Sequence, residues 1–348
     1  MQVGAGSQPI QSVGEFALIK GIGHVVRSSR VRSSGLRLGP GDDAAIWKPR
    51  PGRQVVISTD MLIEGAHFRH DWSNAESIGH RALAVNVSDI AAMGARPRVA
   101  VVSLGLRAKS HDRWVYDFYR GSANLGNTCH FTIAGGDIVR SPDKTIVSVT
   151  VHGELPAGSH GLRRDRARPG DIVAVTGPLG LAAGGVRILS ENTLQKDGAP
   201  VMLEAHRRPV PKVLQGMLLL RAGVESAMDL SDGLFGDLPK ICEASGVTAT
   251  IRHDQIPIPH TVRWNFPDWF DLATRGGEDF ELLFTCSPDT LERVGRLFRR
   301  WGLSTPIQIG TLASAKADGP AIRLKGLDLR TVDVEPGAFD HFGVAAAG

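Results

Sequence analysis

The 348-residue chain is longer than a typical single domain, so we expect two domains, each with its own hydrophobic core. Its three cysteines include no CxxC pair, which predicts a protein without disulfides in a reducing cytoplasm. It has no apolar run of the ~18 to 20 residues that cross a membrane and no signal-peptide pattern, which predicts a protein without membrane contact. The net charge is +4, and the basic residues form short groups, such as the arginines of residues 163–168 and the pair Arg207 and Arg208. Short groups and an aromatic content of only 6% favour surface or phosphate-facing arginines over a nucleic-acid partner.

The N-terminal half is predicted to mix strands and helices. Residues 1–13 are small and polar without periodicity, which is typical of a disordered tail. A short helix is expected from Glu15. Apolar residues at steps of three or four predict a second helix from Ala75 to Met93, and a third is expected around Trp114. Compact β-rich runs predict strands over QVVIST, RVAVVSLGL, HFTIAGG and TIVSVTVHG.

A stretch rich in Gly, Pro and Arg, GELPAGSHGLRRDRARPGD, separates this half from the next. We therefore place an N-terminal domain at residues 14–154 and a C-terminal domain at residues 155–348. The second half begins with the strand-like run DIVAVTG and continues with helix-like and strand-like runs in LAAGGVRILS, VLQGMLLLRAG and FELLFTC. The overall fold class is α+β, an α/β chain in two domains.

Acidic residues recur at the ends of apolar segments, beside Gly, Ser or Thr. They are Asp42, Asp43, Asp60, Asp89, Asp137, Asp229, Asp232, Glu278 and Asp279. Small neighbours admit a large polyanion, but carboxylates alone would repel it, so several Mg²⁺ ions and a phosphorylated ligand are predicted. Each acid taken alone is equally consistent with a helix cap or a turn. Asp89 also falls on the apolar stripe Ile78, Ala82, Val85, where burying an unpaired carboxylate is costly.

Several familiar nucleotide-binding and catalytic patterns are missing from the sequence. There is no GxxxxGK[ST] loop and no HRD or DFG set, so ATP would be held in another way than in P-loop or protein kinases. No nucleophile paired with a base is legible, so no covalent residue or general base is predicted. His67 is by itself more typical of a hydrogen-bonding surface residue than of a metal ligand or proton carrier.

Seven motifs in this order resemble thiamine-monophosphate kinases, within the superfamily of aminoimidazole-ribonucleotide synthetase and selenophosphate synthetase. They are GPGDDAAI, STDMLIEGAHF, ALAVNVSDIAAMGARP, AGGDIVRSP, RPGDIVAVTGPLG, AMDLSDGL and GGEDFELLF. The resemblance runs from about Gly14 to Phe342. GDD, SDGL and GGD-like pieces are shared loosely by the superfamily, whereas STD followed by EGxHF, together with NxSDxAAMGA and GGEDFEL, is typical of the kinase.

The resemblance implies a fold, an activity and a set of ligands. The N-terminal domain would pair with its twin to close a β-barrel across a homodimer, beside a C-terminal α/β sandwich domain like that of aminoimidazole-ribonucleotide synthetase. The activity would be ATP-dependent phosphorylation of thiamine monophosphate, assisted by several Mg²⁺ ions. Metal contacts are implied for Asp43, Ser58, Thr59, Asp60, Asp89, Asp137, Asp229 and Asp232, nucleotide contacts for Gly136, Asp137, Arg164 and Ser231, and substrate contacts for His67 and Glu278.

Two positions depart from the family pattern. Pro336 stands where relatives often have a Trp, so ring stacking on the substrate would fall to Phe339 or be weaker, and Ile138 replaces the threonine of GGDT. Two other functions stay open at this point: a ring-closing synthetase of the same superfamily, and a nucleotide-binding module without catalysis. A homodimer is also expected because the apolar strands QVVIST, RVAVVSLGL and TIVSVTVHG would leave edges exposed in one small domain.

Overall fold

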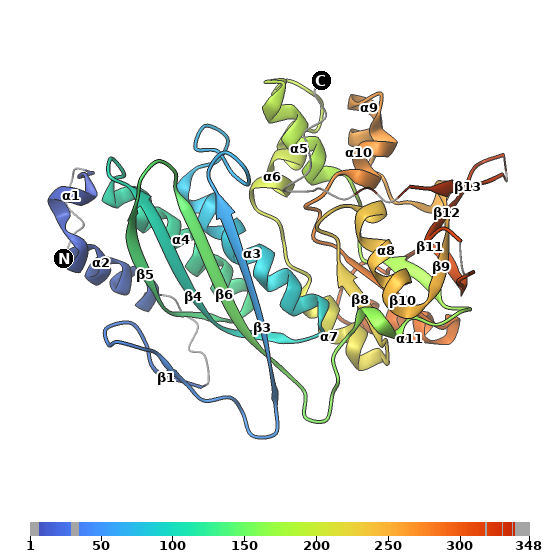
Figure 1. Ribbon diagram of the computed structural model, residues 1–348, viewed down its shortest axis with the longest axis horizontal. Helices are drawn as coiled ribbons and strands as arrows, with labels where there is room; N and C mark the ends of the chain where they lie inside the picture. Colours follow the sequence, from blue (N-terminus) through green and yellow to red (C-terminus); the bar gives the residue numbers. More distant parts are fainter. Residues whose placement is uncertain (1–6, 29–34, 317–318, 329, 336, 338–348) are drawn as a thin grey trace. The chain divides into compact units, whose positions relative to one another are not determined.

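The computed structural model describes residues 7–28, 35–316, 319–328, 330–335 and 337, which form two compact units (Figure 1). Unit 1 comprises Met1–His160 and Arg207–Val213, and unit 2 comprises Gly161–His206 and Leu214–Gly348. Within the described residues, no helix is both long and apolar enough to cross a membrane. Each unit combines a sheet with helices, which confirms the α+β class.

Unit 1 is built on a four-stranded sheet of order β3-β6-β4-β5. Its strands are β3 (Gln54–Ile63), β4 (Arg96–Arg107), β5 (Thr132–Ser141) and β6 (Ile146–Leu155), which confirms the four predicted runs. β6 is antiparallel to β3 and to β4, whereas β4 and β5 are parallel. β4 and β6 are interior strands, so the expectation that their edges are exposed is wrong. Across the described residues the sheet does not close into a barrel within one chain.

Three helices pack on this sheet or on one another, and all three were predicted. They are α2 (Glu15–Arg27), α3 (Ala75–Ala92) and α4 (Asp112–Cys129). α3 and α4 cover one face of the sheet in Figure 1, and α2 packs against α4. A side chain at Gly79 would overlap the carbonyl oxygen of Phe118, and one at Gly121 would overlap that of Glu76. These two glycines therefore allow the backbones of α3 and α4 to touch.

The apolar stripe predicted for α3 is only part of its buried surface. Ile78 and Ala82 are 1% and 0% exposed, but Leu83, which is outside the stripe, is also 0% exposed. The helix is buried on several sides because it lies between the sheet and α4. Val85 and Asp89 of the stripe are half-buried, so the Asp89 carboxylate is only partly removed from water.

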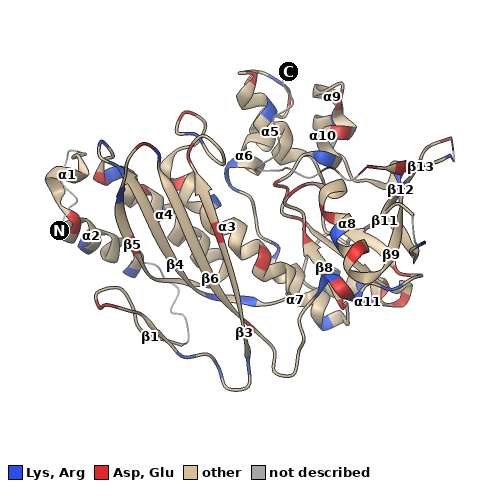
Figure 2. Ribbon diagram, viewed as in Figure 1, with Lys and Arg blue, Asp and Glu red and all other residues tan. Residues whose placement is uncertain are grey.

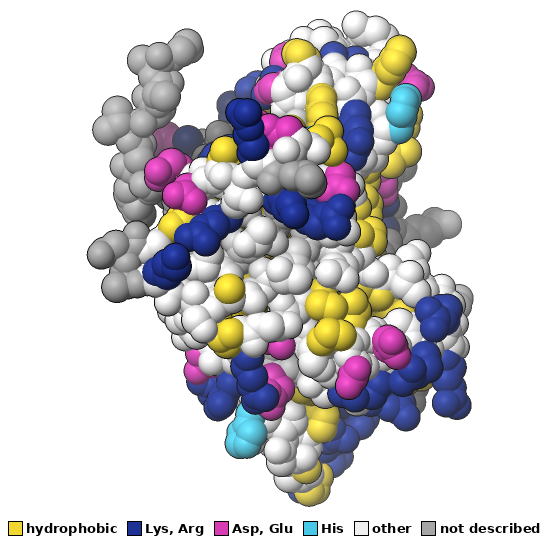
Figure 3. Space-filling view, turned by 90° about the vertical axis from the view of Figure 1, so that its right-hand side faces the viewer, with side chains coloured by type: hydrophobic (Ala, Val, Ile, Leu, Met, Phe, Trp, Pro, Cys, Tyr) yellow, Lys and Arg dark blue, Asp and Glu magenta, His cyan; other side chains and the backbone are white. Residues whose placement is uncertain are grey.

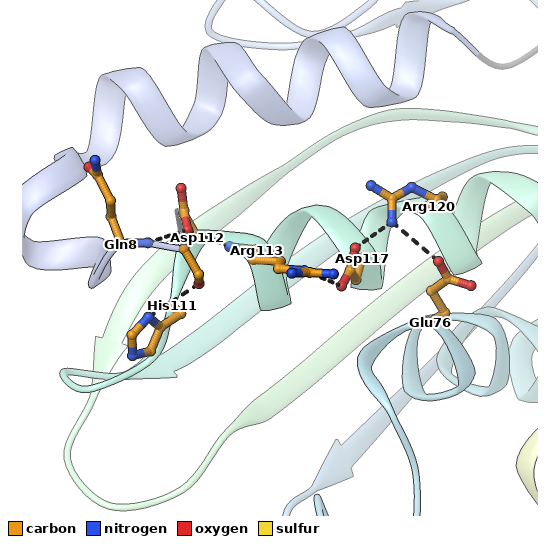
Figure 4. Close-up of polar contacts among 8 residues, drawn as sticks. Gln8, Glu76, His111, Asp112, Arg113, Asp117 and Arg120 are labelled. Atoms are coloured by element: carbon orange, nitrogen blue, oxygen red, sulfur yellow. Dashed lines mark hydrogen bonds and ion pairs between the residues drawn. The ribbon is translucent and has the colours of Figure 1, made fainter. Parts of the chain in front are cut away.

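The described part of the N-terminal segment packs on unit 1. A short helix, α1 (Ile10–Val13), falls within the segment expected to be a tail. The Gln8 N–H donates to Asp112 Oδ1 at 2.9 Å, at the start of α4 (Figure 4). Farther along α4, Arg120 bridges Asp117 and Glu76 of α3, the latter at 3.2 Å. Polar contacts thus attach the N-terminal segment to α4 and α4 to α3.

Unit 2 is built on a seven-stranded sheet of order β13-β12-β9-β11-β7-β10-β8, in which only β12 and β9 are parallel among the described strands. The strands are β7 (Ile172–Val175), β8 (Ser226–Asp229), β9 (Val247–Arg252), β10 (Leu282–Cys286), β11 (Ile307–Ser314), β12 (Ile322–Lys325) and β13 (Thr331–Val334). The helices include α5 (Leu181–Ser190), α6 (Ala199–Arg207), α7 (Val213–Ala222), α8 (Leu234–Ser245), α9 (His260–Asn265), α10 (Trp269–Arg275) and α11 (Pro288–Arg300). Side chains of the sheet and of α8 form the hydrophobic core.

Charged residues are distributed over the elements of both units (Figure 2). On the face shown in Figure 3, basic side chains are interspersed with acidic and hydrophobic ones. In the arginine group of residues 163–168, Arg163 pairs with Asp165 at 2.6 Å and Arg168 pairs with Glu225 at 2.6 Å. These arginines form surface ion pairs, as expected for local basic groups.

Candidate functional site

Unit 1 brings three of the predicted metal ligands together where β3 lies against α3. Ser58 and Asp60 are two residues apart on β3, so their side chains leave the strand on the same face. Asp89 lies near the C-terminal end of α3, and its Oδ2 accepts a 2.5 Å hydrogen bond from the Ser58 hydroxyl. All three residues are half-buried. We call Ser58, Asp60 and Asp89 the Asp60–Asp89 cluster.

The two carboxylates of this cluster make ionisation costly. Burial, followed by the negative charge of Asp89, raises the pKa of Asp60 to about 6. Among the described residues, no group of three His, Cys, Asp or Glu side chains is arranged to hold a metal ion. Mg²⁺ needs only one or two carboxylates when phosphate and water oxygens complete its shell. Two neighbouring carboxylates, of which Asp89 raises the cost of ionising Asp60, therefore fit this cation.

β5 places Gly136 in the row of the sheet that contains Asp60. The pairing across the strands runs Gly136, Val102, Val149, Asp60. A side chain at Gly136 would overlap the backbone oxygen of Val102, so the close approach of β4 and β5 requires glycine there. Asp137 is exposed and pairs with Ser103 in the neighbouring row. The register therefore does not bring Asp137 into the row of Asp60.

Two other predicted residues of unit 1 engage in local hydrogen bonds. Thr59 leaves β3 on the face opposite to the Asp60–Asp89 cluster, and its hydroxyl lies 3.0 Å from both Val149 O and Thr150 Oγ1. His67 accepts the Ile63 N–H at Nδ1, at 3.1 Å, which fixes the turn after β3 and places the ring proton on Nε2. This turn contact gives His67 the hydrogen-bonding role that its sequence context favoured.

Asp42, Asp43 and Arg164 belong to other segments of the chain than the strand and helix of this cluster. Asp42 and Asp43 are exposed in the loop between β1 (Leu36–Leu38) and β2 (Ile46–Trp47), where the Asp43 N–H donates to Asp42 Oδ1 at 2.9 Å. Arg164 begins the short 3₁₀ helix η1 (Arg164–Arg166) of unit 2, and it is exposed. Phe339 and Pro336 lie outside the described residues.

Unit 2 carries a second group of predicted residues around the loop that follows β8. Asp229 is the last residue of β8, is 4% exposed and pairs with Leu282 of β10. Ser231 and Asp232 follow in the loop that leads into α8, and both are half-buried. The sheet and the helix thus fix both ends of this loop.

Two residues that the sequence motifs did not single out hold this loop in place. The buried carboxylate of Asp237 accepts the N–H groups of Ser231 at 2.9 Å and of Asp232 at 2.8 Å. Lys240 Nζ lies 2.6 Å from Asp232 Oδ2 and 2.8 Å from Asp237 Oδ1. Burial alone would lower the pKa of Lys240, but its bonds to the two carboxylates raise it, so the ammonium stays charged. The i,i+3 spacing of Asp237 and Lys240 in a helical segment is the sequence signal that identifies the pair.

The loop of residues 276–279 packs backbone to backbone on the loop that carries Ser231. The Glu278 N–H donates to Ser231 O at 2.9 Å, and a side chain at Gly277 would overlap the same oxygen. Glu278 has a φ of 73°, a left-handed conformation that is strained for a residue other than glycine. Its Oε2 lies 3.3 Å from Nδ1 of His206, which is 4% exposed. His206 is a further residue that the sequence motifs missed.

Asp279, next to Glu278, caps a helix. Its carboxylate accepts the Gly180 N–H at 2.7 Å and the Ala182 N–H at 3.2 Å, at the start of α5. Burial raises the pKa of Asp279 to about 7, against the effect of these two hydrogen bonds. This acid of the predicted set therefore has a structural role.

Comparison with known proteins identifies both domains. Residues 41–155 match the family described as AIR synthase related protein, N-terminal domain, and residues 168–321 match the corresponding C-terminal domain. The chain is 38% identical over 281 residues to the thiamine-monophosphate kinase of Bacillus subtilis (strain 168), covering 80% of this chain and 85% of that protein. It is 39% identical over 278 residues to the thiamine-monophosphate kinase of Escherichia coli (strain K12), covering 78% and 82%.

Solved structures give the same grouping. Thiamine-monophosphate kinase from Stenotrophomonas maltophilia K279a aligns with a TM-score of 0.78 at 36% identity, over 90% of this chain and 97% of that chain. AaThiL, solved in complex with AMPPCP and TMP, aligns with a TM-score of 0.73 at 28% identity, over 96% and 99%. Because both domains match in order and the relatives cover most of its length, the chain belongs to the AIR synthase related family, and within it to the thiamine-monophosphate kinases.

Proposed function

We propose that this protein transfers the γ-phosphate of ATP directly to the phosphate of thiamine monophosphate, with several Mg²⁺ ions held by its acidic residues. The observation that carries the metal part is the Asp60–Asp89 cluster, where Ser58 fixes Asp89 at 2.5 Å and the pKa of Asp60 rises to about 6. The relative AaThiL, solved with an ATP analogue and TMP, supports the choice of both substrates.

The proposed ligands keep the roles inferred from the motifs. Asp43, Ser58, Thr59, Asp60, Asp89, Asp137, Asp229 and Asp232 contact metal, and Gly136, Asp137, Arg164 and Ser231 contact the nucleotide. When bound, Mg²⁺ neutralises phosphate oxygens and aligns the two reacting groups. The side chains of the chain itself bind and orient: Ser58 holds Asp89, and Lys240 holds Asp232.

No residue needs to remove a proton or form a covalent intermediate. A phosphate monoester has its second pKa near ~6, so the attacking oxygen of thiamine monophosphate is already largely ionised at neutral pH. Burial raises the pKa of Cys242 to about 11 and those of Cys129 and Cys286 to about 12, which keeps these thiols protonated and unreactive. We also propose that the protein is cytoplasmic, a location with which buried, reduced thiols agree.

Stereochemistry tests the direct transfer. With ATP that is chiral at the γ-phosphorus, a single in-line transfer inverts the configuration in thiamine diphosphate, whereas two successive transfers restore it. Inversion is expected. Net retention, or an acyl-phosphate trapped on Asp60 or Asp137, would overturn the direct mechanism. Incubation with ATP and each candidate acceptor, with and without Mg²⁺, tests the substrate and the metal separately.

We also propose that thiamine monophosphate contacts His67, Glu278 and Phe339. Glu278 supports this best, because its backbone is fixed on Ser231 O at 2.9 Å and its carboxylate is held 3.3 Å from His206. A fixed carboxylate that is one-third exposed is suited to a cationic ring or its amino group. The strained φ of Glu278 is the kind of conformation that clusters at ligand sites.

A homodimer formed through the sheet of unit 1 is the last part of the proposal. Apolar side chains on β3 are exposed on the face opposite to the helices: Val55 is 42%, Ile57 is 62% and Met61 is 55% exposed. Val139 on β5 is also 55% exposed, and the register places it on the same face. Apolar residues along one sheet face are typical of a surface that a second copy covers.

A further inference from the structure

The loop of residues 231–232 is held by an ion pair, Asp237 and Lys240, that is not among the predicted ligands. Asp237 is buried with no exposed side-chain surface and uses both carboxylate oxygens: Oδ2 accepts two backbone N–H groups, and Oδ1 contacts Lys240. Lys240 then reaches Asp232 Oδ2 at 2.6 Å. A single buried carboxylate thereby fixes both the backbone of the loop and the lysine that holds its acidic side chain.

Helix capping explains only half of this arrangement. Asp237 lies in the first turn of α8, where an acidic side chain is favoured by the helix dipole and by unpaired N–H groups. Lys240 lies about one turn farther on, near the middle of the helix, where the dipole does not favour a cation. Its position is therefore set by the two carboxylates and not by the helix.

Lys240 engages one oxygen of Asp232 and leaves the other available. In the described residues, Oδ1 of Asp232 accepts no hydrogen bond, whereas Oδ2 is bound by Lys240. The Asp232 side chain is 30% exposed and that of Lys240 is 35% exposed, so the carboxylate is accessible from solvent. A carboxylate held in this way is oriented before any ligand arrives.

We propose that Lys240, held by Asp237, is a positioning residue that orients the carboxylate of Asp232 for the Mg²⁺–ATP complex. The proposal rests on the proposed function, in which Asp232 is a metal ligand. Without Lys240 the Asp232 side chain becomes mobile, and binding must then pay the entropy of ordering it, which lowers affinity about tenfold.

Isothermal titration with AMPPCP and MgCl₂ tests this without turnover. Lys240→Met should weaken binding about tenfold, and Lys240→Arg, which can still bridge two carboxylates, should stay within about threefold of wild type. Lys196→Met is the matched control, because Lys196 is a part-buried lysine of unit 2 that bonds Asn265 O, outside the loop of residues 231–232, at 2.9 Å. That variant should bind as the wild type does.

A double-mutant cycle with Asp232→Asn separates positioning from a general loss of structure. We expect Lys240→Met to weaken binding in the wild type and to add nothing in the Asp232→Asn background. Equal weakening in both backgrounds, unchanged binding or tighter binding in Lys240→Met would overturn the inference. If Lys240→Met does not fold, Lys240→Gln takes its place in the cycle. If Asp232→Asn itself binds like wild type, the metal role of Asp232 fails, and the inference falls with it.

Discussion

Replacing Asp60 by Asn should abolish most activity while making the metal-free protein more stable. Both effects follow from the position of Asp60 beside Asp89, where burial and the second carboxylate raise its pKa to about 6. Asn keeps the size of the side chain but removes the charge that attracts a cation. If Asp60 binds Mg²⁺ as proposed, its loss removes part of the several kcal/mol that the ion supplies to phosphoryl transfer, and kcat/KM should fall at least ~100-fold.

The stability gain has a definite sign and pH range. The pKa of Asp60 is raised from 3.8 to about 6 on folding, so ionisation costs the folded state about 3 kcal/mol at 1.36 kcal/mol per pH unit. Solvent screening of a half-buried group reduces this to about 1 to 2 kcal/mol. The cost is absent below about pH 4, grows as the pH rises towards 6 and is complete above it. Asp60→Asn should remove it.

Thermal unfolding in EDTA at pH 7.5 and at pH 4, with turnover at saturating ATP and MgCl₂, measures both effects. We expect a melting temperature higher by about 1 to 3 °C at pH 7.5 and no gain at pH 4. The matched control is Asp71→Asn, since Asp71 is exposed and Arg69 lowers its pKa. That variant should gain no stability and keep full activity. A lower melting temperature at pH 7.5, or near-wild-type turnover, for Asp60→Asn would refute the reasoning.

Three further predictions test other parts of the structure. Gly136→Ala should lower the free energy of unfolding by about 1 to 3 kcal/mol in denaturant, because the new methyl group overlaps Val102 O. Gly135→Ala is the control, since the space around Gly135 is open, and it should change the free energy of unfolding by no more than about 0.5 kcal/mol. Equal losses in the two variants would contradict the packing argument. Glu278→Gln should raise the KM for thiamine monophosphate about tenfold with little change in that for ATP, and equal rises in both would remove its specific role. In sedimentation at micromolar concentration the wild type should be a dimer and the Ile57→Lys variant a monomer. Val332 of unit 2 is similarly exposed, so Val332→Lys is the control and should remain a dimer. A monomeric wild type would rule out the proposed interface.

The regular elements could be predicted because their side chains follow simple periods. α3 and the four strands of unit 1 were found in this way, and the paired acids of the Asp60–Asp89 cluster were both named from their motifs. What periodicity could not supply is the packing around an element. α3 is buried on several sides, so buried residues such as Leu83 lie outside the predicted stripe, and within the stripe Val85 and Asp89 are only half-buried.

The residues that hold the proposed ligands in place were harder to predict from the sequence than the ligands themselves. Asp237, Lys240 and His206 match no motif, and their roles depend on contacts with residues five or more positions away, or across the unit. Asp279 shows the converse. It was included with the acidic set, yet its contacts are the first N–H groups of α5, almost one hundred residues earlier in the chain.

The packing of the Glu278 loop on Ser231 also affects the order in which parts of unit 2 fold. Asp229 pairs with Leu282, and Glu278 donates to Ser231, so the loop after β8 gains these partners only from a strand that is made some fifty residues later. A chain still emerging from the ribosome, with β10 unfinished, can set residues 231–232 only against Asp237 and Lys240 of α8, without the backbone contact to the Glu278 loop. Because such distant pairings form late, the contacts of Asp229 with β10 and of Ser231 with the Glu278 loop are completed only when β10 joins the sheet of unit 2.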